Sequence, residues 1–253
     1  MTEEWNGGDS NIPIKRRSNH SGLGRDEGKL LASQEISKRK VGLFGGTFNP
    51  IHLGHLRGAE EVREVCGLKQ VIFIPAAQPP HKMMEEVIDA RHRLEMVRLA
   101  TMTNPFFSYS DVELQRPGKS YSIDTLRYFL EHGRDSLLFI LGRDAFDEME
   151  TWKEFQNLFS LCDFVVMARP GFGKIAVGSQ LPQALASTFQ YDSGQRCWIH
   201  TSGHRLFFEE INFLDISSTR VRELIEKGAS VKYLVPSEVE VYIRQQKLYQ
   251  KRA

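Results

Sequence analysis

The sequence predicts an α/β protein with a doubly wound parallel sheet, helices on both faces, and a small C-terminal helical part in a single domain. Two observations lead to this fold class. From Lys40 onward, short apolar runs bounded by turn residues alternate with amphipathic stretches, as in successive βαβ units. Most of these runs are rich in Val, Ile, Leu and Phe, which is typical of parallel strands buried on both faces.

Each expected element follows from one of these two patterns. The strands are expected at residues 41–44, 71–74, 106–112, 137–141, 164–167 and 206–211. The helices between them are expected at residues 54–65, 90–102, 123–132, 145–150 and 152–159. In such a sheet, ligands bind beyond the carboxyl ends of the strands.

The chain divides into a tail, one main domain and two distinct segments within that domain. Residues 1–38 are rich in Gly, Ser, Asn and charge, which predicts a disordered extension before a domain over residues 39–250. Residues 171–204 show no clear period and are expected to be a loop-rich insertion with one short helix near 181–188. Residues 217–250 are expected to hold the C-terminal helices. Ser217 or Ser218 would cap the first of them, and Ser237 with Glu240 has capping-box spacing at the second.

Composition excludes several classes of protein. The 33 Lys and Arg nearly balance the 32 Asp and Glu, so the chain lacks the overall basic charge of a non-specific nucleic-acid binder. No run of eighteen apolar residues and no secretory or transit pattern is present, which leads us to expect a cytoplasmic protein without a membrane partner. Three dispersed cysteines indicate neither a disulfide framework nor a zinc site.

The most informative motif, GGTFNPIHLGH at residues 45–55, directly follows the first expected strand. Paired glycines allow close approach of the backbone to a ligand, and Asn-Pro ends the extended run so that a helix can begin near Leu53. His52 and His55 then lie on one face of the helix start, beside unpaired N–H groups and the positive end of the helix dipole. This arrangement favours binding of an anionic oxygen, although either histidine alone fits a surface or capping role better. A zinc site is disfavoured because no carboxylate or cysteine is nearby in sequence.

These residues resemble the nucleotidylyltransferase superfamily, whose motif G-[ST]-F-[DN]-P-x-H-x-G-H is matched at every defining position. Within that superfamily the chain is similar, over roughly residues 41–249, to the bacterial nicotinate-nucleotide adenylyltransferases. Four later segments carry the closer resemblance: PPHK at 79–82, SYSIDTL at 120–126, LGRDAF at 141–146 followed by Trp152, and ISSTRVR at 216–222.

The resemblance implies a Rossmann-like fold and a reaction in which AMP passes from ATP to nicotinate mononucleotide, with release of pyrophosphate. The residues expected at ATP are Gly45, Gly46, Thr47, Phe48, His52, His55, Asp144, Ile216, Ser217, Ser218 and Arg222. Of these, His52, His55 and Arg222 are the catalytic candidates. Asp144 is expected to accept hydrogen bonds from ribose hydroxyls, with a helix N-cap as its alternative role.

The acceptor is expected to contact Lys82, Tyr121, Ser122 and Trp152. The resemblance places the Trp152 indole against the pyridine ring and the turn at Tyr121 against the nicotinate carboxylate. Ser122 stands where the family more often has Thr, which keeps the hydroxyl. No protein metal ligand is expected, because Mg²⁺ would arrive with ATP. A homo-oligomer is compatible with the sequence.

Several other functions stay open at this point. The acceptor of the phosphate could instead be nicotinamide mononucleotide, phosphopantetheine or a cytidylyl-transfer substrate. A class I aminoacyl-tRNA synthetase is disfavoured because the chain has no Lys-Met-Ser-Lys-Ser loop. A nucleotide sensor without turnover is disfavoured by the presence of both histidines, Asp144 and Arg222.

Overall fold

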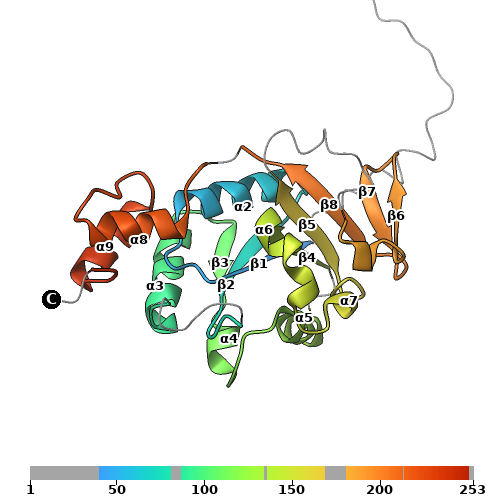
Figure 1. The fold of residues 1–253 in the computed structure, drawn as a ribbon, viewed down its shortest axis with the longest axis horizontal. Helices are drawn as coiled ribbons and strands as arrows, with labels where there is room; N and C mark the ends of the chain where they lie inside the picture. The colour runs from blue at the N-terminus through green and yellow to red at the C-terminus, as the bar shows by residue number, and fades with distance from the viewer. Residues whose placement is uncertain (1–39, 81–86, 134–135, 169–180, 213, 251–253) are drawn as a thin grey trace, which may run out of the picture.

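A single mixed sheet forms the centre of the molecule (Figure 1). The computed structural model describes residues 40–80, 87–133, 136–168, 181–212 and 214–250, so the predicted extension over residues 1–38 lies outside the described part. Within that part the sheet has eight strands: β1 (Val41–Gly46), β2 (Gln70–Pro75), β3 (Phe107–Tyr109), β4 (Leu137–Gly142), β5 (Asp163–Ala168), β6 (Phe189–Asp192), β7 (Cys197–His200) and β8 (Arg205–Glu210).

The strand order confirms the predicted doubly wound topology. The order is β3-β2-β1-β4-β5-β8-β7-β6, and all pairings from β3 to β8 are parallel. Because β2 and β4 flank β1 on opposite sides, the chain reverses its winding direction there. The loops after β1 and β4 therefore separate at this point and leave a crevice at the carboxyl ends of the strands, where ligands of such folds bind.

Helices cover both faces of this sheet (Figure 1). They are α2 (Leu53–Val65), α3 (Ala90–Thr101), α4 (Val112–Gln115), α5 (Ser122–Glu131), α6 (Arg143–Asp147), α7 (Phe155–Leu158), α8 (Ser218–Glu226) and α9 (Ser237–Gln245). Strand β4 shows how the two faces arise: Phe139 joins a core with α5, α6 and α7, whereas Ile140 joins a core with α2, α3, α8 and α9. Side chains alternate between the faces because successive residues of a strand point in opposite directions.

Three local predictions need correction. Of the strand expected over residues 106–112, only β3 is extended, and the chain turns into α4 at Val112. The helix expected over residues 152–159 shortens to α7, because Glu154 adopts a left-handed backbone with φ 53° that a continuous helix does not allow. Ser237 is the first residue of α9 and makes no capping hydrogen bond, since Pro236 holds the N-cap position.

The largest correction concerns residues 171–204. This segment was expected to be rich in loops, but its part from Phe189 to His200 forms the antiparallel hairpin β6–β7, which extends the sheet beyond β8. The helix expected near 181–188 is the single 3₁₀ turn η5 (Gln183–Leu185). Residues 169–180 lie outside the described part.

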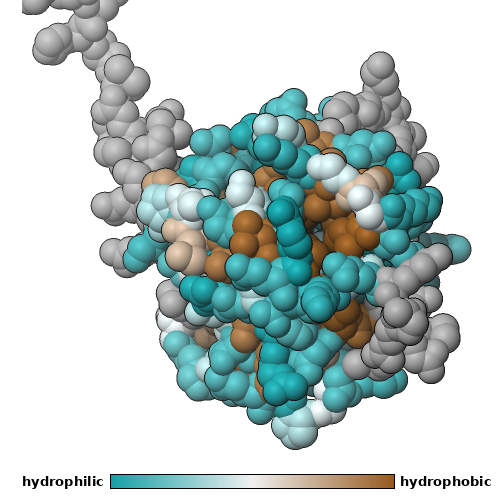
Figure 2. All heavy atoms as spheres, turned by 90° about the vertical axis from the view of Figure 1, so that its left-hand side faces the viewer, coloured by the Kyte–Doolittle hydropathy of each residue, from teal (hydrophilic) through white to brown (hydrophobic). Residues whose placement is uncertain are grey.

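The surface on the side of α3, α8 and α9 is mostly hydrophilic, with hydrophobic side chains visible in hollows between polar ones (Figure 2). Exposed apolar residues of the C-terminal part include Tyr233 and Val241. In the described part of the chain, no helix has both the length and the apolar character needed to cross a membrane.

Candidate active site

The loop after β1 is shaped by Phe48. Its side chain is 3% exposed and packs on Phe44 and Phe73, with ring centroids 5.6 and 5.9 Å away. The Phe48 backbone has φ 47°, a left-handed conformation that is unfavourable for a residue with a side chain. A Cβ at Gly46 would lie 2.9 Å from the Phe48 ring, so only glycine fits there. Phe48, predicted at ATP, is thus a core residue that fixes the conformation of the loop.

The two histidines of the motif form one unit at the start of α2. His52 is the N-cap residue, and its ring stacks on that of His55 with centroids 3.6 Å apart and planes 26° apart. The Nδ1 atom of His55 accepts a hydrogen bond from the His52 backbone N–H at 3.2 Å. When Nδ1 of a neutral imidazole is the acceptor, the ring proton is on Nε2, so His55 presents an N–H donor away from the helix.

His52 is held as a neutral imidazole. The residue is 6% exposed, and burial lowers its pKa to about 4. Its Nδ1 atom is buried with no hydrogen-bond partner among the described residues. Unpaired buried polar atoms are rare in native proteins and require a specific explanation, which a ligand can supply.

Gly54 makes room for this histidine. A Cβ at residue 54 would lie 3.0 Å from Nδ1 of His52 and 3.4 Å from the carbonyl oxygen of Leu214. The distance to Nδ1 is tighter than an ordinary contact, so a side chain at residue 54 would require the imidazole ring to shift by a few tenths of an ångström. A glycine is therefore required at residue 54 for steric reasons.

The N-terminus of α8 is attached to the same loop. Ser217 is the N-cap and accepts a hydrogen bond from the N–H of Arg220 at 3.1 Å. Ser218 Oγ donates to the carbonyl of Pro50 at 2.9 Å, and Arg222 Nη1 donates to the carbonyl of Asn49 at 2.9 Å. Two helix N-termini, those of α2 and α8, therefore meet beside the motif, and such termini favour phosphate groups.

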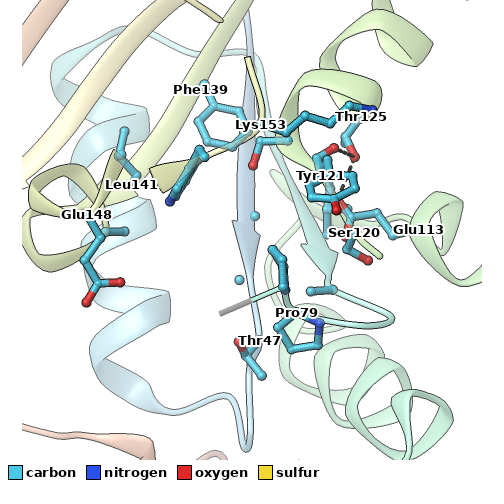
Figure 3. Close-up of a pocket in the computed structure, with 18 of the residues that line it drawn as sticks. Thr47, Pro79, Glu113, Ser120, Tyr121, Thr125, Phe139, Leu141, Glu148 and Lys153 are labelled. Atoms are coloured by element: carbon cyan, nitrogen blue, oxygen red, sulfur yellow. Dashed lines mark hydrogen bonds between the residues drawn. The ribbon is translucent and has the colours of Figure 1, made fainter. Parts of the chain in front are cut away.

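A cavity of about 410 Å³ lies next to this loop, at the carboxyl ends of β1 and β4 (Figure 3). Seven of the predicted site residues line it: Gly45, Gly46, Thr47, Tyr121, Ser122, Asp144 and Trp152. His52, His55, Ile216, Ser217, Ser218 and Arg222 do not line it and belong to the loop and helix ends described above, where Ile216 is half-buried against the core. Lys82 lies outside the described residues.

The end of the cavity away from the loop suits a flat ring with a charge. Trp152 is half-buried there, edge-on to Phe139 with centroids 6.5 Å apart. Tyr121 is the N-cap residue of α5, so the first backbone N–H groups of that helix have no partner within it. The exposed Asp144 carboxylate belongs to the second residue of α6, whose N-cap is Gly142, so Asp144 is not the cap. Arg143 pairs with Asp147 at 2.6 Å and does not line the cavity.

Three charged residues of the cavity were not predicted from the sequence: Glu113, Glu148 and Lys153. Lys153 lines the cavity, with Nζ 3.1 Å from the Asp124 carboxylate and 4.9 Å from the centre of the Tyr121 ring. Glu113 is 7% exposed and accepts a hydrogen bond from Thr125 at 2.6 Å (Figure 3). Burial raises the pKa of Glu113 above its usual value, against the effect of the hydroxyls that donate to it. The position of Lys153 next to Trp152 was a usable signal, whereas nothing in the residues around Glu113 marks it as buried.

The site has two parts with different chemistry: the loop with the two helix N-termini, and the end of the cavity that contains Trp152. One half offers helix N-termini, an imidazole N–H and a guanidinium, all suited to phosphate oxygens. The other half offers an aromatic surface, backbone amides and a lysine, suited to a planar acceptor with a negative charge. Residues 45–47 border both halves.

Comparison with known proteins agrees with this geometry. Residues 43–224 match the cytidylyltransferase-like family. A relative from Geotalea daltonii, named "Probable nicotinate-nucleotide adenylyltransferase", is 45% identical over 211 residues, which are 83% of this chain and 98% of the relative. A relative of the same name from Geobacter sp. strain M21 is 47% identical with the same coverage. Among solved structures, nicotinic acid mononucleotide adenylyltransferase of Plasmodium falciparum, complexed with NaAD, matches with a TM-score of 0.61 over 83% of this chain and 97% of that chain, at 17% identity. At that identity the likeness concerns the fold.

Proposed function

Because this chain belongs to the cytidylyltransferase-like family and to its nicotinate-nucleotide adenylyltransferases, we propose that it transfers AMP from ATP to nicotinate mononucleotide. The products are nicotinic acid adenine dinucleotide and pyrophosphate, and the enzyme is a nucleotidyltransferase of NAD biosynthesis. The reaction would take place in the cytoplasm. The observation that carries this proposal is the direct contact between a phosphate-binding loop and a cavity for a planar anionic acceptor: residues 45–47 line the cavity and lead into the His52–His55 pair.

In this proposal ATP binds along the loop and the two helix ends. The N–H groups that begin α2 and α8 face the triphosphate, together with the hydroxyls of Ser217 and Ser218. The Nε2–H of His55 and the Arg222 guanidinium stabilise charge that develops on the α-phosphate and the leaving pyrophosphate. His52 acts as a neutral donor, since burial keeps its pKa near 4. Asp144 accepts hydrogen bonds from ribose hydroxyls.

Nicotinate mononucleotide occupies the cavity. Its pyridine ring stacks on Trp152, and its carboxylate receives the backbone N–H groups at the start of α5. The Lys153 ammonium at the same end of the cavity favours a carboxylate over an uncharged amide, which supports the acid as the acceptor rather than nicotinamide mononucleotide.

The chemical step is an in-line displacement at the α-phosphorus. A phosphate oxygen of the acceptor forms the new P–O bond while the bond to pyrophosphate breaks, so no covalent intermediate with the protein is needed. The acceptor phosphate has a second pKa of about 6 and is mostly dianionic at neutral pH, so no strong general base is required. Mg²⁺ enters as the MgATP complex and neutralises the triphosphate. Catalysis then depends on the relative position of the two substrates.

Pyrophosphate release tests the proposal. The purified chain is given MgATP with either nicotinate mononucleotide or nicotinamide mononucleotide, and we expect kcat/KM to be at least about 10-fold higher for the acid, equivalent to about 1.4 kcal/mol. Omission of Mg²⁺ in the presence of a chelator should abolish release. The variant Lys153→Gln, which keeps the length of the side chain, should narrow the preference for the acid.

The alternative outcomes separate the parts of the proposal. Preference for the amide would overturn the assignment of the carboxylate site and leave the ATP site in place. Absence of pyrophosphate with both acceptors would contradict the proposed function itself.

A further inference from the structure

Arg93 of α3 connects three separate segments of the chain. The residue is 0% exposed. Its Nη1 donates to the carbonyl of Thr47 at 2.8 Å, its Nη2 to that of Ala77 at 3.0 Å, and its Nε to that of Ile88 at 3.1 Å. One planar guanidinium therefore joins the loop after β1, the loop after β2 and the residues before α3.

Stability alone does not account for a guanidinium at this place. Among the described residues Arg93 forms no ion pair with a carboxylate, and burial lowers its pKa to about 10, which still leaves it charged at neutral pH. Charged groups are expensive to bury, and an apolar side chain of similar volume is often neutral or stabilising in such positions. What the apolar side chain lacks is the fork of fixed donors that holds several carbonyl groups in one geometry.

The loop after β2 is also fixed from the side of the acceptor. Ser120 Oγ accepts hydrogen bonds from the N–H groups of Ala77 at 2.9 Å and Gln78 at 3.3 Å, and the Ser120 N–H donates to the Gln78 carbonyl at 2.9 Å. Ser120 in turn donates to the buried Glu113. Residues 76–78 thus form a bridge between Thr47, at the ATP loop, and Ser120, which directly precedes the acceptor-binding turn at Tyr121.

We propose that Arg93 is a positioning residue that sets the separation between the ATP-binding loop and the acceptor-binding turn by holding both Thr47 and the bridge at residues 76–78. This inference rests on the proposed function, because it concerns the distance between the two substrates. Arg93 touches neither substrate. Its effect is therefore on the alignment of the acceptor oxygen with the α-phosphorus, and a misplacement of about 1 Å can lower the rate about 100-fold.

The test compares Arg93→Lys with Arg98→Lys, a matched control on the same helix whose guanidinium pairs with Glu95 at the surface. A lysine keeps the positive charge but cannot reach three carbonyls in the fixed directions of a guanidinium. We expect kcat of Arg93→Lys to fall about 100-fold, while KM for ATP and for nicotinate mononucleotide each change by less than about 3-fold. The control should match the parent protein. An unchanged kcat, or a rise in KM without loss of kcat, would overturn the inference.

A second variant and a second readout keep the inference testable on its own. Ser120→Ala removes the bond to residues 76–78 from the other side, so it should also lower kcat, and its effect should be less than additive with that of Arg93→Lys. Amide hydrogen exchange needs no substrate: residues 45–47 and 76–78 should exchange faster in Arg93→Lys than in Arg98→Lys. Equal exchange would contradict the role of Arg93, whereas an inactive parent protein with the exchange difference intact would contradict only the proposed function.

Discussion

At the scale of single residues, the motif after β1 is a set of steric and electrostatic requirements. Phe48 anchors the loop to the core, Gly46 leaves space for the Phe48 ring, and Gly54 leaves space for His52. The buried His52 is kept neutral, while His55 receives the backbone N–H that orients its ring. Each position of the motif thus has a physical role that can be tested separately.

Gly54→Ala tests the steric requirement. Alanine is the better helix former by about 1 kcal/mol, so the helix itself should not lose stability from this change. The new Cβ would nevertheless meet the His52 ring and displace it from His55. We expect kcat to fall at least about 10-fold with a small change in the melting temperature, measured by pyrophosphate release and thermal unfolding. Neither Gly58→Ala nor Gly133→Ala serves as a control. A Cβ at Gly58 would lie 2.8 Å from Met167, and Gly133 has φ +76°, a backbone conformation that is unfavourable for alanine.

If Gly54→Ala retained full activity, the stacked arrangement of the two histidines would not matter for turnover. If it lost both activity and stability in proportion, the effect would be a general loss of folding rather than a displaced ring.

At the scale of elements, α8 is the part whose start matters most. Ser217 caps it, and Ser218 and Arg222 attach it to residues 49 and 50. Ser217→Ala should lower the free energy of unfolding by about 1 kcal/mol, because the N–H of Arg220 loses its acceptor. Chemical denaturation measures this change. The matched control is Ser237→Ala at the start of α9, where the serine makes no capping bond and the expected change is near zero.

Equal effects of the two substitutions would contradict the capping role of Ser217. A higher KM for ATP in Ser217→Ala alone would add support to the phosphate site at this helix end.

The elements also show where sequence reasoning succeeds. The parallel strands were predicted because each is a short run of apolar residues buried on both faces, as in β4 and β5. The hairpin β6–β7 was missed because its residues alternate little and its stability comes from pairing with β8, for example of Trp198 with Leu206. When a strand is stabilised mainly by pairing with a strand that is distant in sequence, its own residues need not show a hydrophobic period that reveals it.

The candidate site could be predicted to a similar degree. Residues in a continuous motif, such as His52 and His55, were found because their spacing places them at one helix start. Arg93 was missed although it occupies the apolar face of α3 with Met96, Val97 and Ala100, where a charge is unusual. Its partners are backbone carbonyls, which every residue has, so the sequence contains no complementary residue that would reveal its role.

At the scale of the whole molecule, buried histidines couple stability to pH. The pKa of His52 is about 4 in the folded protein and about 6.5 when unfolded, so between these values the unfolded chain binds a proton that the folded chain does not. Stability is therefore complete above pH 6.5 and falls as the pH decreases through that range. Burial lowers the pKa of His200 as well, which acts in the same direction.

Urea unfolding at pH 7.5 and pH 5.5 measures this coupling. Protonation of His52 in the unfolded chain should by itself make the free energy of unfolding about 1.4 kcal/mol lower at pH 5.5 than at pH 7.5. In His52→Gln the free energy of unfolding should change less between the two pH values by this amount, whereas in His132→Gln, at an exposed position, the change should equal that of the parent protein. An identical pH dependence in His52→Gln and the parent protein would mean that His52 is not buried as a neutral group.

The reversal of winding at β1 has a consequence for how such a protein can change over time. In the function proposed above, residues for the triphosphate come from the start of α2 and from α8, whereas residues for the ring and carboxylate of the acceptor come from the start of α5 and from Trp152 and Lys153. These two sets lie in separate stretches of the chain, although Asp144, which we assign to the ATP ribose, lies between Ser122 and Trp152, and the loop at residues 45–47 borders both sets. Substitutions at residues 121, 122, 152 and 153 can therefore exchange one acceptor for another while the nucleotide donor is retained, so that one ancestral scaffold can give rise to transferases with different specificities.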